Sequence, residues 1–191
     1  MMKILITLSI AFAMTACSSL TNYSQQFAGS CYRLVKPSIL YRGWCAKLDS
    51  SLASSDTCLG IQSLPIRTSQ KFGGVPLTSY EQFKSDSEFW NKVLFYGATI
   101  FNDHAVLDQI AADTPIQIIG VYEKQWGIDG YFWAVRAQIL GGSYKNTVVT
   151  LPTYKFHLGD SWTNLPPAQK GTDSFVLNGE YLRACSIDSI P

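Results

Sequence analysis

The two histidines are the residues best suited to catalysis or metal binding, because each lies close to an acidic residue. His104 directly follows Asp103, and His157 precedes Asp160 by three positions. A carboxylate can orient an imidazole as a general base, or the two groups can share a metal ion. A catalytic zinc usually has three protein ligands, however, and the sequence contains no H-E-x-x-H motif. We therefore predict no metal site, and we interpret both histidines as loop or strand-edge residues.

A second candidate for chemistry is the triplet Gly159-Asp160-Ser161. It resembles the Gly-Asp-Ser block of GDSL-type hydrolases, in which the serine is the nucleophile. In that family the block lies near the start of an α/β domain and a later Asp-x-x-His completes the site. Here the block lies near the C-terminus, Trp162 replaces the leucine, and no histidine follows. The G-x-S-x-G motif is absent as well. We predict that the chain is not an enzyme; the alternative is a hydrolase of unfamiliar type that joins His104 or His157 to a serine or a carboxylate.

Aromatic residues are abundant, with five Trp, ten Tyr and ten Phe. Trp126 lies in a predicted turn and Trp162 in a proline-rich loop, so we predict that these two are exposed and bind a sugar or a peptide. We expect Trp133 in the core. The alternative is that all the aromatic residues fill the core of a β domain. Neither Gly73-Gly74 nor Gly141-Gly142 opens a helix after a strand, so no phosphate-binding loop and no cofactor are predicted.

The N-terminal segment follows the pattern of a secretory signal peptide. Lys3 supplies a positive charge and Ile4 to Met14 is mostly apolar. This apolar run is shorter than the ~20 residues that a membrane-spanning helix needs.

Met14-Thr15-Ala16-Cys17 resembles the lipobox of bacterial lipoproteins, although that family usually has leucine in place of Met14. The resemblance implies that residues 1–16 are removed and that Cys17 carries a diacylglycerol and an acylated amine, which anchor the chain to a bilayer. Ser18 implies the outer membrane, since aspartate at this position retains such proteins at the inner membrane of enteric-type bacteria. The domain would then face the periplasm or the cell surface. The alternative is plain secretion, with Cys17 as an incidental thiol.

Four cysteines follow Cys17. An even number in an exported chain indicates two disulfides, which have three possible connectivities. We favour Cys45–Cys58, which closes a short loop, and Cys31–Cys185, which joins the first predicted strand of the domain to the last. A metal site made of these four cysteines is the alternative, but the C-x₂₋₄-C spacing of such sites is absent.

The elements that must position these residues are mostly strands. Period-two alternation and β-branched residues predict strands, and two capping-box patterns, Ser79-x-x-Gln82 and Ser85-x-x-Glu88, predict one or two short helices between Ser79 and Lys92. The predicted strands are 31–35, 39–41, 59–66, 93–101, 115–124, 131–140, 144–151 and a closing strand or hairpin within 175–183. Those at 115–124, 131–140 and 144–151 should form a meander. The predicted fold class is therefore mainly β, a small antiparallel barrel or curled sheet, SH3-like or OB-like in size.

The predicted organisation is a signal peptide (1–16), a lipidated cysteine with a flexible tether (17–30) and one disulfide-linked β-rich domain (31–191). The precursor has a net charge of +1, and removal of Lys3 leaves the mature chain neutral, so we exclude nucleic acid as a partner. We predict an envelope lipoprotein with a non-catalytic binding or structural domain, whose partners are the membrane and a protein or glycan of the envelope. The alternative is an inhibitor or immunity protein against a toxin or a cell-wall hydrolase.

Overall fold

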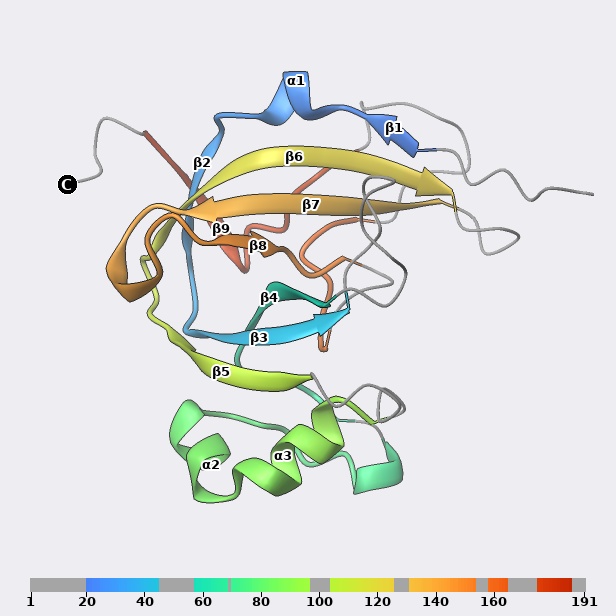
Figure 1. The fold of residues 1–191 in the computed structure, drawn as a ribbon, viewed down its shortest axis with the longest axis vertical. Helices are drawn as coiled ribbons and strands as arrows, with labels where there is room; N and C mark the ends of the chain where they lie inside the picture. Colours follow the sequence, from blue (N-terminus) through green and yellow to red (C-terminus); the bar gives the residue numbers. More distant parts are fainter. Residues whose placement is uncertain are drawn as a thin grey trace, which may run out of the picture.

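The computed structural model describes residues 20–44, 57–68, 70–96, 104–125, 131–153, 158–164 and 175–186. Within them lie nine strands and three short α-helices (Figure 1). The strands are β1 (Leu20–Asn22), β2 (Cys31–Leu34), β3 (Ser38–Trp44), β4 (Thr57–Ser63), β5 (Ala105–Ile110), β6 (Pro115–Gln125), β7 (Tyr131–Ile139), β8 (Val148–Thr150) and β9 (Leu182–Cys185). The helices are α1 (Ser24–Phe27), α2 (Tyr80–Ser85) and α3 (Ser87–Leu94). None of the described helices is long and apolar enough to cross a bilayer.

The nine strands form one mixed, largely antiparallel sheet in the order β5-β3-β4-β8-β7-β6-β2-β9, with β1 also paired to β6. Among the described strand pairs, only β4 and β8 run parallel. The mainly β fold class is confirmed. The predicted barrel or curled sheet is wrong, because the sheet is neither closed nor strongly curled. Alternation of apolar and polar residues is the same in open and closed sheets, so the pattern could not decide closure.

The predicted meander is confirmed. β7 pairs antiparallel with β6 on one side and with β8 on the other. Trp133 lies in the core as predicted, and the main core contains four alternate side chains of β7: Trp133, Val135, Ala137 and Ile139. This face of the sheet contributes to the largest hydrophobic cluster among the described residues.

A second hydrophobic cluster lies where α2 and α3 pack beside β5 and β3 (Figure 1). Successive residues of β3 divide between the two clusters: Ile39 and Tyr41 pack toward the helices, whereas Leu40 packs into the main core. This alternation is the period of two that a strand imposes. β3 is therefore buried on both faces.

The two helices lie where the capping patterns predict them. The hydroxyl of Ser79 accepts a hydrogen bond from the backbone N–H of Gln82 at 3.1 Å, and this cap begins α2. The second predicted cap is wrong by one residue, because Asp86 rather than Ser85 caps α3 through the N–H of Phe89. The strand predicted over 93–101 is also wrong at its start, since Val93 and Leu94 belong to α3.

Residues 20–30 belong to the folded domain, as β1 and α1, so the flexible tether predicted over 17–30 is wrong for this range. β1 pairs antiparallel with the end of β6, from Leu20 opposite Lys124 to Asn22 opposite Tyr122. The backbone N–H of Gly29 also donates to the carbonyl of Ile118 at 2.9 Å. The segment is mostly polar in composition, but the side chains of Tyr23 and Phe27 pack against the main core.

The predicted disulfide Cys31–Cys185 is confirmed. The two residues lie opposite each other in the β2–β9 pair, with their Cα atoms 5.1 Å apart. Cys58 is also disulfide-bonded, and its predicted partner Cys45 lies outside the described residues.

Candidate functional site

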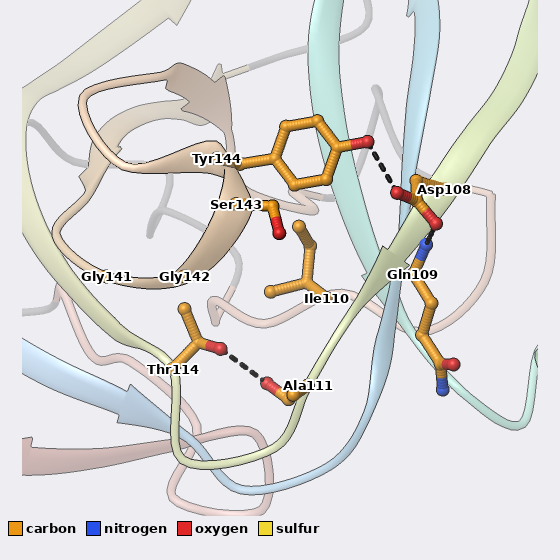
Figure 2. Close-up of a pocket in the computed structure, with 9 residues that line it drawn as sticks. All are labelled: Asp108, Gln109, Ile110, Ala111, Thr114, Gly141, Gly142, Ser143 and Tyr144. Atoms are coloured by element: carbon orange, nitrogen blue, oxygen red, sulfur yellow. Dashed lines mark hydrogen bonds between the residues drawn. The ribbon is translucent and has the colours of Figure 1, made fainter.

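A cleft of about 180 Å³ lies between the end of β5 and the turn that follows β7 (Figure 2). It is lined by Asp108, Gln109, Ile110, Ala111, Thr114, Gly141, Gly142, Ser143 and Tyr144. Gly142 has a φ of +73°, a conformation that glycine adopts without strain, and it starts the 3₁₀ helix that carries Tyr144. The backbone N–H of Leu140 donates to the carbonyl of Pro115 at 2.8 Å and holds this turn against the start of β6.

Asp108 is the charged group of the cleft. Its two oxygens accept hydrogen bonds from the Tyr144 hydroxyl at 2.6 Å and from the Gln109 backbone N–H at 2.7 Å. The bond from Tyr144, followed by that from Gln109, lowers the pKa of Asp108, and Tyr80 and Lys84 act in the same direction. The carboxylate is therefore a fixed negative charge at neutral pH.

The two tyrosines beside Asp108 are neutral at the same pH. The hydrogen bond to Asp108, together with burial, raises the pKa of Tyr144 to about 12. Burial first, and then the charge of Asp108, raises the pKa of Tyr80. The Lys84 ammonium lies 5.5 Å from the centre of the Tyr80 ring, so a cation lies beside the cluster of Asp108, Tyr80 and Tyr144.

The chemistry of the cleft suits binding better than catalysis. The described residues of its lining include no histidine, cysteine or lysine. A general base works best with a pKa near the working pH, and the lowered pKa of Asp108 moves it away from that range. The cleft instead offers a charged acceptor, the hydroxyls of Ser143 and Tyr144 and the amide of Gln109, all suited to hydrogen-bonding a polar ligand.

A second, larger cleft of about 360 Å³ lies beside the C-terminal end of α3. Its lining is more aromatic and aliphatic, with Arg67 as its cation: Arg67, Thr68, Phe72, Val93, Leu94, Tyr96 and Leu158. Tyr96 packs edge-on against Phe72, with ring centres 4.9 Å apart. The Lys71 ammonium lies 4.2 Å above the Tyr96 ring and donates to its hydroxyl.

Trp162, predicted to be exposed for binding, is 0% exposed, so that prediction is wrong. Its ring stacks on Tyr181, with centres 5.5 Å apart, and its backbone N–H donates to the carbonyl of Pro152 at 2.9 Å. Prolines near a tryptophan indicate a loop, but they do not reveal whether the loop folds inward. Trp126, the other predicted binding residue, lies outside the described residues.

The Gly159-Asp160-Ser161 block forms a structural turn. The Ser161 hydroxyl donates to the carbonyl of Thr163 at 3.0 Å. The carboxylate of Asp160 accepts a hydrogen bond from the Tyr181 hydroxyl at 3.2 Å. The backbone carbonyl of Asp160 accepts one from the side-chain amide of Gln62 at 3.1 Å. These contacts attach the block to β4 and to the turn before β9.

The structure does not bring the described candidate residues for chemistry together. His104 packs beside Phe95, with ring centres 5.5 Å apart, whereas Ser161 bonds within its own turn. His157 lies outside the described residues. Across the described ranges, no group of three or more His, Cys, Asp and Glu is placed to hold a metal ion.

Sequence reasoning missed the Asp108–Tyr144 cleft because it missed β5. Residues 105–110 read Ala-Val-Leu-Asp-Gln-Ile, which does not alternate between apolar and polar residues, so period-two patterning gave no signal for this strand. The cleft itself has no local signature, since Asp108 and Tyr144 are 36 residues apart. No protein-family model, no curated protein and no solved structure matches the chain.

Proposed function

We propose that this chain is a lipid-anchored lipoprotein of the bacterial outer membrane whose β domain binds an envelope partner without catalysis. Two features support the anchor and the compartment. The Met14-Thr15-Ala16-Cys17 sequence resembles a lipobox. The Cys31–Cys185 disulfide is of the kind that persists in oxidising spaces such as the periplasm.

The observation that carries the binding role is the Asp108–Tyr144 hydrogen bond, which holds a charged carboxylate in place at the wall of a cleft. Together with the hydroxyl of Ser143 and the amide of Gln109, it favours a polar ligand that donates hydrogen bonds, such as a glycan or a peptide. The partner is therefore a glycan or protein of the envelope, recognised by hydrogen bonds.

The anchor is tested by replacing the lipidated residue. Cys17→Ser should abolish incorporation of labelled palmitate and release the protein from the membrane fraction. The unchanged precursor, expressed in the same cells, is the control. Retention of the variant on membranes through high-salt and carbonate washes would contradict lipid anchoring.

The binding role is tested by photocrosslinking in cells. Gln109 is exposed at the cleft, and Gln25 is an exposed glutamine on α1. A photoreactive residue in place of Gln109 should yield a specific crosslinked species, and the same residue in place of Gln25 should not. Asp108→Asn should remove that species, because the amide no longer presents a charged acceptor.

Equal crosslinking from both positions, or a crosslink that survives Asp108→Asn, would contradict binding at this cleft. A single stoichiometric complex with a secreted toxin or hydrolase would assign the protein to the inhibitor class instead. Thermal melting of each variant separates lost binding from lost folding.

A further inference from the structure

The lipid anchor and the Asp108–Tyr144 cleft belong to opposite ends of the sheet. We infer that the mature domain stands on the bilayer on the end where β1 meets β6, and presents the cleft away from the lipid. This inference rests on the proposed lipidation of Cys17. It places the partner of the cleft away from the surface of the anchoring membrane.

The chain between the anchor and the fold is very short. Only Ser18 and Ser19 separate Cys17 from Leu20, the first residue of β1. Three Cα-to-Cα steps span at most about 11 Å when fully extended. Leu20 must therefore remain within that distance of the lipidated residue, and Lys124, its partner in β6, lies only ~5 Å further away.

β1 cannot detach to lengthen the connection to the anchor, because Tyr23 and Phe27, which follow it, pack against the main core. The Tyr23 N–H donates to the carbonyl of Val121 at 2.8 Å, and its hydroxyl donates to Glu123 at 2.9 Å. The Tyr23 ring packs edge-on against Trp133, with centres 6.0 Å apart. Phe27, at the end of α1, packs in the same way against Phe175 at 4.8 Å.

Detaching this segment would be costly because of Glu123. Its side chain is 2% exposed, and one of its two oxygens already has no hydrogen-bond partner in the described part of the structure. Removing the Tyr23 hydroxyl would leave the other oxygen without that donor. If the segment left, this hydrogen bond would be lost and the Tyr23 and Phe27 rings, which pack against the main core, would be exposed to water, so the segment stays docked.

The cleft lies at the far end of the same strand. β6 runs from Pro115 to Gln125, which corresponds to about 33 Å at ~3.3 Å per residue. The turn that carries Tyr144 is attached to Pro115, whereas β1 pairs with residues 122–124. Figure 1 shows this separation: β1 lies near the arrowhead of β6, and the connection from β7 to β8 lies at the opposite end.

Nothing in the composition favours a domain that lies on its side. Proteins that bind bilayers along a flank use a basic surface or a broad apolar face. The precursor carries a net charge of only +1, and Lys3 belongs to the signal peptide. The flank formed by α1 presents the uncharged polar residues Gln25 and Gln26. The short anchor at one end therefore sets the orientation.

The test measures the distance of two positions from the bilayer in the mature lipoprotein reconstituted into vesicles. A fluorescent group is attached to azidophenylalanine in place of Asn22 at the end of β1, or in place of Lys145 beside the cleft. Both positions are exposed. The vesicles contain lipids with a quencher on the headgroup. Fluorescence at position 22 should be largely lost, and fluorescence at position 145 should be retained.

A matched variant carries a flexible insertion of about 20 Gly and Ser residues between Ser19 and Leu20. Such a linker has a mean end-to-end distance of about 25 Å, so quenching at position 22 should fall. Equal quenching at positions 22 and 145 in the parent protein would show that the domain lies flat, and would overturn the inference. Absence of quenching at both would show that β1 detaches, and would overturn it too. Failure of the protein to float with vesicles would instead overturn the lipid anchor itself.

Discussion

The Cys31–Cys185 disulfide should make a large contribution to the stability of the fold. The two cysteines are 154 residues apart in sequence, so the bond closes a loop that contains most of the domain. In the chain-entropy model, opening a loop of this size costs about 5 kcal/mol at 25 °C. Domains of this kind have total stabilities of about 5–15 kcal/mol. Replacing both cysteines with alanine should therefore remove at least a third of the stability.

The assay is equilibrium urea unfolding without reductant, so that the disulfide of Cys58 stays intact in every variant. The double variant Cys31→Ala/Cys185→Ala should unfold at a lower urea concentration. Its dependence on urea should be steeper, since the unfolded chain is no longer cross-linked and exposes more surface.

The matched control is Arg183→Ala on the same strand. Arg183 forms an exposed ion pair with Asp113, in which both side chains are more than half accessible, so its loss should cost at most ~1 kcal/mol. If the double variant loses no more stability than this control, the entropic reasoning about β2 and β9 is refuted.

Three further predictions concern single side chains. Tyr23→Phe removes a donor to the buried Glu123 carboxylate and should cost about 1.5–3 kcal/mol, with faster amide hydrogen exchange in β1 and α1; unchanged exchange there would contradict the docked segment. Tyr144→Phe should raise the pKa of Asp108 toward its ordinary value in a carboxyl NMR titration. Folding lowers the pKa of Asp108, so the ionised carboxylate stabilises the fold above about pH 4, and this stabilisation is lost as the pH falls through the lowered pKa. Tyr144→Phe should therefore make the stability less sensitive to acid. Ser79→Ala removes the N-cap of α2 and should lower stability by about 1 kcal/mol in thermal melting, whereas unchanged melting would mean that the cap does not act in solution.

The sequence by itself determined the local features of this protein. Ser79 capped a helix as predicted, because the serine and the N–H that it accepts from are only three residues apart. β6, β7 and β8 formed a meander, because adjacent strands joined by short turns pair with little loss of chain entropy. The alternation along β7 placed Trp133 in the core, since a strand puts every second side chain on one face.

The sequence and the tertiary structure each determined part of the Cys31–Cys185 disulfide. The number and placement of the cysteines limited the choices, and the pairing of Cys31 with Cys185 was favoured because they lie at the two ends of the domain. Only the pairing of β2 with β9 brings their Cα atoms to 5.1 Å, the range that a disulfide requires.

Only the tertiary structure decided the features that depend on contacts between distant segments. The sheet stays open because β5 and β9 do not pair, and no alternation pattern encodes the absence of a pair. Trp162 turns inward, where its ring stacks on Tyr181. Residues 20–30 dock on the sheet, where Tyr23 donates a hydrogen bond to Glu123, a residue 100 positions away in the sequence. The Asp108–Tyr144 cleft forms in the same way, where the end of β5 meets the turn after β7. Local propensity is a property of neighbouring residues, whereas these contacts appear only once the whole sheet has brought its strands together.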